Sequence, residues 1–261
     1  MSASASASAA QRRAAPLSAT VQIGLAAGLL AVAAGCWVLT GDRMDGMDAG
    51  PGTALGGLGW FLVSWAVMMA AMMLPASAPM AVAHARIRPA AWGRGTLTFV
   101  AGYLLAWTAA GLVAYALIEG VRSLDLGFLA WDEAGRYVAG GAILAAALFQ
   151  LTPAKDACLR RCRDPRAARS GLEHGVNCIA CCWALMAALF ALGVMSIGWM
   201  AFVAALIVAE RLLPTKLMAR QGVAVLLVVL GLGVAFAPGQ VPGLTLPDSQ
   251  DAAGMTMMMQ Q

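Results

Sequence analysis

Five of the six cysteines fall in one short stretch of the chain, between positions 158 and 182. Cys158 and Cys162 lie in a polar segment, and Cys178, Cys181 and Cys182 begin an apolar one. On a helix, the spacing of three and four residues puts the last three thiols on one broad face. Thiolates are soft ligands that suit Cu(I), zinc or an iron–sulfur cluster. The sequence predicts a soft-metal site here, and inert packing of small thiols is the alternative.

Two neighbours extend this cysteine face along the same helix. His174 precedes Cys178 by about one turn and could complete a mixed site, while Met186 follows Cys182 by one turn. His84 is the other histidine of the chain. Two histidines cannot ligate paired membrane haems in the usual bis-histidine fashion.

Four methionines form a stripe on an earlier apolar segment. Met68 pairs with Met72 and Met69 with Met73 at helical spacing, so their thioethers share one stripe. Thioethers bind Cu(I), although methionine is also a good filler of irregular cores. Further methionines lie in the first predicted outer loop, at positions 44 and 47, and in the C-terminal run Met255–Met259. Both segments could collect Cu(I) weakly, and a simple flexible tail is the alternative for the C-terminal run.

Other catalytic signatures are absent from the sequence. It contains no HExxH zinc motif, no phosphate-binding Walker loop and no G-x-S-x-G nucleophile elbow. Glu210 and Arg211 are adjacent, and we interpret them as an interfacial ion pair, with gating or proton coupling as the alternative. We therefore expect a binding or transport protein rather than an enzyme.

The elements that position these residues are apolar segments. Hydrophobic residues make up 61% of the 261 residues and charged residues only 11%, with a mean hydropathy of +0.77. Soluble domains carry about 25% charged residues, and disordered chains are still more polar. Six cysteines are also few for a disulfide-stapled secreted module. The composition predicts an all-α, polytopic membrane protein.

The apolar runs predict about seven transmembrane helices in one domain, residues 20–238. The first nineteen residues form a Ser/Ala-rich cytoplasmic lead, and residues 239–261 form a Met-rich outer tail. The fifth and sixth spans divide within the four residues 195–198 of one long apolar stretch, so a tight helical hairpin is required. The predicted spans are Thr20–Leu39, Gly59–Ala83, Thr96–Glu119, Ala134–Thr152, Gly175–Val194, Ser196–Leu213 and Arg220–Ala237.

The basic residues test this layout independently. With the N-terminus in the cytoplasm, fourteen of the 17 Lys and Arg residues fall in inside segments, so we interpret the basic clusters as topology signals. The C-terminus is then outside, and we expect a bacterial cytoplasmic (inner) membrane protein. The five clustered thiols lie on the cytoplasmic side, where they stay reduced, which disfavours a structural disulfide.

Three motifs resemble a known bacterial family. They are WAVMMAAMMLPASAP at Trp65–Pro79, QLTPAKDACLRRCRDP at Gln150–Pro165, and the segment Gly171–Met200. Together they are similar to the family described as predicted metal-binding integral membrane proteins, a domain of unknown function, over residues 59–214. The resemblance implies membrane location and a metal site. That site would be carried by the methionine stripe and the five clustered cysteines.

We hypothesise that the chain binds a soft metal and translocates or delivers it, with Cu(I) the first choice and zinc the second. The methionine stripe would provide weak relay sites and the cysteines a tighter one. Two alternatives remain: a membrane thiol oxidoreductase, or a non-catalytic assembly subunit with packed cysteines. We expect the lipid bilayer as a partner, with another membrane protein or a metal chaperone, and no nucleic acid.

Overall fold

The computed structural model describes residues 17–44, 57–87, 91–123, 134–164, 170–193, 196–212, 216–241 and 244. All regular structure in these ranges is helical, as predicted. The helices are α2 (Ala19–Met44), α3 (Leu58–Ile87), α4 (Trp92–Ser123), α5 (Arg136–Leu151), α6 (Pro153–Arg163), α7 (Gly171–Leu192), α8 (Ile197–Leu212) and α9 (Lys216–Phe236), followed by the 3-10 turn η4 (Pro238–Gln240).

Four of these helices are long and apolar enough to cross a membrane by length and composition. They are α2, α3, residues 92–121 of α4, and α7. The pair α5 and α6 would make a fifth span, bent by 69°. Helix α8 has only 16 residues, and the apolar part of α9 is Arg220–Phe236. Each of the seven predicted segments corresponds to a helix, but seven membrane crossings and the orientation stay predictions.

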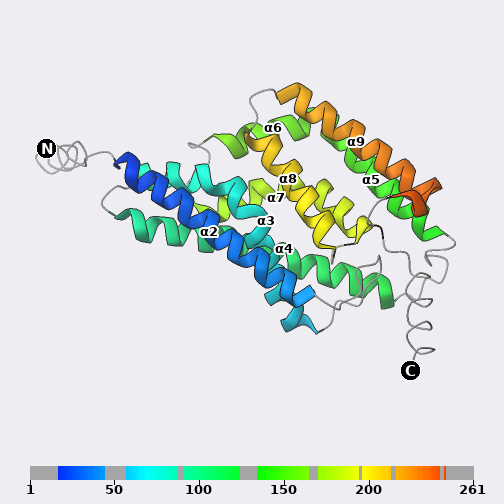
Figure 1. The fold of residues 1–261 in the computed structure, drawn as a ribbon, viewed down its shortest axis with the longest axis horizontal. Helices are drawn as coiled ribbons and strands as arrows, with labels where there is room; N and C mark the ends of the chain where they lie inside the picture. Colours follow the sequence, from blue (N-terminus) through cyan, green and yellow to red (C-terminus); the bar gives the residue numbers. More distant parts are fainter. Residues whose placement is uncertain are drawn as a thin grey trace, which may run out of the picture.

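The helices pack in a spatial order that differs from the chain order. Helix α2 lies against α3, α3 against α4, α4 against α7, α7 against α5, and α5 against α9. Helix α8 packs against α3, α7 and α9, and α6 folds back onto α7. Figure 1 shows α7 and α8 in the middle, between the α2–α3–α4 group and the α5–α9 pair. The centre of the molecule is therefore built by α3, α7 and α8.

The polar segment that carries Cys158 and Cys162 lies between predicted spans, and the structure folds it into helix α6. The chain breaks at Thr152, which is extended with φ −73° and ψ 149° because the ring of Pro153 disfavours a helical residue before it. Pro153 then takes the first helical position, where its missing N–H costs nothing. The Thr152 hydroxyl accepts a hydrogen bond from the Lys155 backbone N–H at 3.3 Å and so caps α6.

Two further local signals fix the ends of α7. Ser170 is its N-cap, and its hydroxyl accepts a hydrogen bond from the Glu173 backbone N–H at 3.2 Å. At the other end, Gly193 has φ 108°, a conformation open to glycine. Helix α7 ends at Leu192 and helix α8 starts at Ile197, so this long apolar stretch forms two helices, as the sequence required.

A close approach of α4 and α7 depends on glycine. A Cβ atom added at Gly171 would collide with the Phe99 carbonyl oxygen, and one at Gly175 would collide with the Ala106 side chain. Small residues let helix backbones approach in this way. This contact determines how closely the cysteine-bearing face of α7 approaches Tyr103 on α4.

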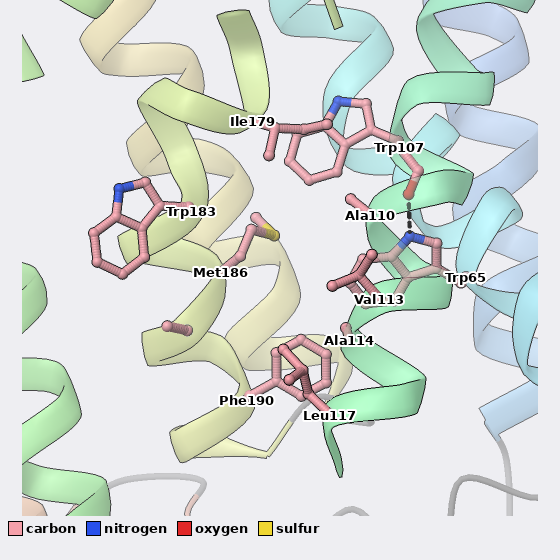
Figure 2. A pocket seen from close by; sticks show the side chains of 11 residues that line it. Trp65, Trp107, Ala110, Val113, Ala114, Leu117, Ile179, Trp183, Met186 and Phe190 are labelled. Carbon is pink, nitrogen blue, oxygen red and sulfur yellow. Dashed lines mark hydrogen bonds between the residues drawn. The ribbon is translucent and has the colours of Figure 1, made fainter. Parts of the chain in front are cut away.

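Beyond this contact, α3, α4 and α7 leave an apolar groove of about 480 Å³. Figure 2 shows its wall formed by Trp107 and Val113 on one side and by Trp183 and Phe190 on the other. Trp65 also lines it, and its indole N–H donates to the Trp107 carbonyl oxygen at 2.8 Å. The groove offers aromatic and aliphatic surface.

Several expectations fall outside the described residues. The Ser/Ala-rich lead up to residue 16, Met47 and the Met255–Met259 run are among them. Met44 is described: it is the last residue of α2 and is buried in the main hydrophobic core.

Candidate metal centre

The cysteine face predicted for α7 is buried in the middle of the protein. Cys178, Cys181 and Cys182 are each no more than 2% exposed, and all three belong to the main hydrophobic core. All six cysteines of the chain are free thiols. The helical spacing thus places three reduced sulfurs on the face of α7 that packs into the core.

Helix α6 adds a fourth sulfur. Because α6 folds back onto α7, Cys162 Sγ lies 3.1 Å from Cys181 Sγ. The hydrogen bond with Cys181 lowers the pKa of the Cys162 thiol, the Arg211 guanidinium acts in the same direction, and burial opposes both. Helix α6 lies outside the seven apolar segments, so this thiol approaches the others from a polar part of the chain.

Cys158 does not take part in these sulfur contacts. It lies one turn before Cys162 on α6, is half-buried and packs against the edge of the core. The structure therefore brings together four of the five predicted cysteines: Cys162, Cys178, Cys181 and Cys182.

Arg211 of α8 reaches three of the four thiols. Its Nη2 lies 2.8 Å from Cys178 Sγ, 3.7 Å from Cys162 Sγ and 3.8 Å from Cys182 Sγ. The side chain is only 8% exposed. A guanidinium group stays protonated in proteins, so a permanent positive charge lies among the sulfurs.

The expected interfacial ion pair between Glu210 and Arg211 is wrong. Glu210 instead pairs with Lys155, with Oε2 and Nζ 2.8 Å apart, and both side chains are almost completely buried. Successive residues of a helix point in different directions, so Glu210 and Arg211 face different neighbours. Three of the fourteen basic residues interpreted as topology signals, Lys155, Arg211 and Arg220, are buried with defined partners rather than at a membrane surface.

A polar network around Glu210 holds α6 in place. Lys155 Nζ also donates to the Cys181 carbonyl oxygen at 2.8 Å, and Gln150 Nε2 donates to Glu210 Oε1 at 2.6 Å. Arg220 donates to the Gln150 carbonyl oxygen at 2.9 Å and pairs with Asp156 at 3.1 Å. These contacts tie the bend after α5 to the cysteine-bearing turn of α7.

An aromatic residue of α4 completes the surroundings of Cys178. The Tyr103 hydroxyl lies 3.1 Å from Cys178 Sγ. His174 is buried beside this tyrosine, with ring centroids 5.5 Å apart, and its Nε2 has no hydrogen-bond partner among the described residues. Its ring contacts are thus with Tyr103 and Phe99, and it is not among the groups in contact with the sulfurs.

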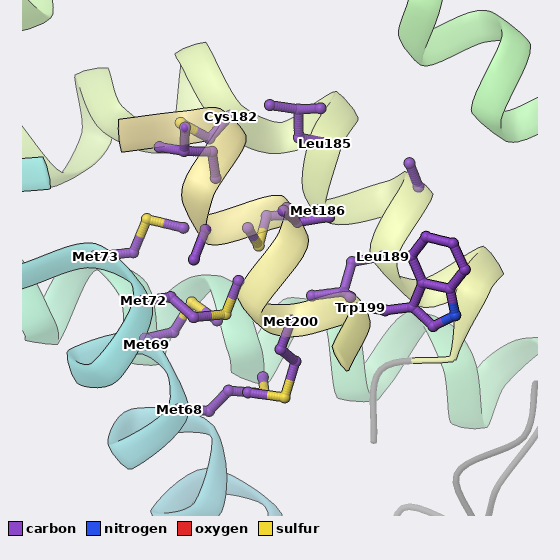
Figure 3. Packing of buried hydrophobic residues seen from close by; sticks show 14 of the residues in the cluster. Met68, Met69, Met72, Met73, Cys182, Leu185, Met186, Leu189, Trp199 and Met200 are labelled. Carbon is purple, nitrogen blue, oxygen red and sulfur yellow. The ribbon is translucent and has the colours of Figure 1, made fainter. Parts of the chain in front are cut away.

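The methionine stripe of α3 lies in the same buried core as the thiols. Met68, Met69, Met72 and Met73 are at most 3% exposed, and α3 continues as one helix through Pro75 and Pro79. Figure 3 shows the four side chains directed toward α8 and α7, with Met186, Met200 and Cys182 on the facing side. Met200 of α8, fully buried, is a thioether that the sequence reasoning missed.

The donors do not form a closed metal site as they stand. Among the described residues, no group of three or more His, Cys, Asp and Glu side chains is spaced to hold a metal ion. The chemistry of the donor set nevertheless suits Cu(I), because four thiols gather at one point beside buried thioethers. The guanidinium of Arg211 lies against three of these sulfurs, those of Cys162, Cys178 and Cys182.

Sequence reasoning missed Arg211, Lys155 and Tyr103 as members of this site. The available signal was the presence of charged residues within or beside apolar helices, which are costly to bury without a partner. That signal does not say which partner each one takes.

A comparison with protein families relates this chain to a family of copper chaperones. The family model described as PpoB2, copper chaperone, matches residues 62–234. This range contains the methionine stripe, all four gathered cysteines and Arg211. No curated protein and no solved structure matches the chain.

Proposed function

The chain belongs to the PpoB2 copper chaperone family, and on this premise we propose that it holds Cu(I) at Cys162, Cys178, Cys181 and Cys182 and hands it on. The family membership supports a copper-related function. The observation that carries the proposal is the convergence of four buried sulfurs from α6 and α7. Copper is here the cargo of the protein.

The methionine stripe serves as a weaker station for the same ion. Thioethers are neutral soft donors, so they attract Cu(I) less strongly than thiolates do. A path from Met68 and Met72 to the thiols would run through the shared core of α3, α7 and α8. Sites of graded strength favour both entry and release.

The setting of this function is a bacterial inner membrane. Four helices with the length and composition of spans support membrane association. Large apolar side chains exposed on the outer helices, such as Leu97 at 72% and Phe236 at 74%, support it further. We propose seven spans with the N-terminus in the cytoplasm, which puts the thiols on the cytoplasmic side, close to a metal chaperone or another partner protein.

Metal analysis of three proteins tests the proposal. The wild type, the Cys178→Ser/Cys181→Ser/Cys182→Ser variant and a Cys36→Ser control are purified in detergent and loaded under reducing conditions. Cys36 lies on α2 and takes no part in the sulfur contacts of α6 and α7, so its loss should change nothing. We expect near-stoichiometric tightly bound copper in the wild type and the control, and loss of the tightly bound copper in the triple variant, because serine oxygen is a hard donor.

Two other results would contradict the proposal. Zinc held in preference to copper by the wild type would change the identity of the cargo. A wild type that stays empty after loading would favour the assembly-subunit hypothesis, in which the cysteines are only packed.

One observation favours a second candidate function, thiol redox chemistry. Cys162 and Cys181 lie close enough that a small movement would bring them to bonding distance. Oxidation would join the two sulfurs, releasing two protons and two electrons to an external disulfide or quinone. Incubating the purified protein with oxidised glutathione and mapping its disulfides tests this function, which requires a Cys162–Cys181 bond formed within seconds.

A further inference from the structure

We infer that Arg211 is the built-in counter-charge of the metal site, which makes the thiols specific for a monovalent ion held by two thiolates. This inference rests on the proposed function and names what selects the ion at that site. It assigns Arg211 as a positioning and specificity residue.

The first step is that the charge of Arg211 is buried among thiols. A buried charge is stable only when an opposite charge or strong hydrogen-bond acceptors compensate it. The neighbouring carboxylate, Glu210, is engaged by Lys155. Nη2 of Arg211 contacts the thiols, while its Nε and Nη1 have no hydrogen-bond partner within the described ranges. The groups placed to compensate this charge are therefore the sulfurs.

The second step is the charge balance of a loaded site. Two thiolates, one guanidinium and one monovalent ion are neutral together. A divalent ion with the same two thiolates leaves one uncompensated positive charge, and four thiolates around it leave a negative one. Three thiolates would balance a divalent ion, but no group of three or more such side chains among the described residues is spaced to hold a metal ion. Since net charge is costly in a buried site, Arg211 favours Cu(I) over Zn²⁺.

The third step is that Arg211 and the ion need not occupy the same place. The closest approach of the guanidinium is to Cys178, whereas the closest pair of sulfurs is Cys162 and Cys181. Its Nη2 lies 3.7 Å from Cys162, near enough to donate to a metal-bound thiolate there. Such outer donors orient metal ligands and tune the affinity of a site.

The test is the Cu(I) dissociation constant of the full chain in detergent, measured by competition with a coloured Cu(I) chelator. The variants are Arg211→Gln, which removes the charge, and Arg211→Lys, which keeps it. Arg86→Gln is the control, because Arg86 is exposed and bonds to Gln22 on α2. Zn²⁺ affinity is measured for each protein with a zinc chelator, and gel filtration checks that each one is folded.

We expect Arg211→Gln to weaken Cu(I) binding by about a hundredfold, the usual effect of removing one partner of a buried charge pair. Arg211→Lys should stay within about tenfold of wild type, and the Cu(I) preference over Zn²⁺ should fall only in Arg211→Gln. Rescue by lysine separates a charge effect from lost packing. If Arg211→Gln does not fold, Arg211→Met carries the same test with a side chain suited to the apolar surroundings.

Two outcomes overturn the inference. Arg211→Gln could bind Cu(I) as tightly as wild type or more tightly, which would make the guanidinium a competitor of the metal. Alternatively, Arg211→Lys could fold and yet bind Cu(I) as weakly as Arg211→Gln does. A wild type that binds no Cu(I) would instead overturn the proposed function, so the two failures are distinguishable.

Discussion

At the scale of single residues, the site depends on which cysteines turn toward α7. Cys162 and Cys158 are both on α6 and one turn apart, yet only Cys162 is in contact with another sulfur. The two residues therefore form a matched pair in one helix, where one change removes a donor and the other leaves the gathered thiols intact.

Cys162→Ser should weaken Cu(I) binding by at least about tenfold, because a thiolate donor is replaced by a hard oxygen. Cys158→Ser should bind within about threefold of wild type, since its sulfur stands apart from the other four. Chelator competition measures both. Equal losses in the two variants would mean that the site includes Cys158, as the sequence predicted.

The buried ion pair of Lys155 and Glu210 makes a second prediction at this scale. Lys155→Met should destabilise the protein by about 3–5 kcal/mol, because it leaves the Glu210 carboxylate buried without its partner. The double variant Lys155→Met/Glu210→Gln should recover much of that loss, since a buried pair replaced as a whole is often nearly neutral. Thermal unfolding in detergent compares them, and a double variant no more stable than the single would refute the argument.

At the scale of elements, α3 supplies a stripe of thioethers and α7 a face of thiols. Both faces follow from helical spacing, and both are buried in one core. Met80 offers a control on α3, because it is buried in a separate, smaller cluster with Leu29 and Phe99.

Changing Met68, Met69, Met72 and Met73 to leucine should remove weak binding of Ag(I), a stand-in for Cu(I), while the tight thiol-bound equivalent stays. Leucine keeps the core volume nearly constant, so the fold should persist. Met80→Leu should leave the whole titration unchanged. Isothermal titration calorimetry measures both kinds of binding. A curve for the quadruple variant that superimposes on the wild-type curve would mean that the methionines only pack.

Close packing of α4 on α7 gives a further prediction for these elements. Gly175→Val should force the two helices apart, because its side chain would collide with Ala106. Separation would move Tyr103 away from Cys178 and lower the unfolding temperature. Gly24→Val on α2 is the control, since a Cβ there meets nothing within 4 Å. Equal unfolding temperatures would contradict the role given to this contact.

At the scale of the whole molecule, the prediction concerns how many times the chain crosses the membrane and in which direction. Seven spans place residue 90 and residue 214 inside, and residue 195 outside. Reporter fusions at these three positions, using an enzyme active only outside the cytoplasm, should be active at residue 195 alone. Activity at residue 214 would indicate that α8 does not cross the membrane.

The sequence by itself determined every α-helix of the described residues except α6, and the buried faces of α3 and α7, because these depend on local spacing. The apolar runs located the seven segments to within a few residues, and intervals of three and four residues grouped the cysteines of α7 and the methionines of α3. Only the tertiary structure decided that Cys162 joins the thiols, that Cys158 stays apart, and that Arg211 rather than His174 points among them. The physical reason is that these contacts depend on the bend at Thr152 and on the rotation of α8 against α7. Both result from packing between segments far apart in the chain, which helical periodicity does not encode.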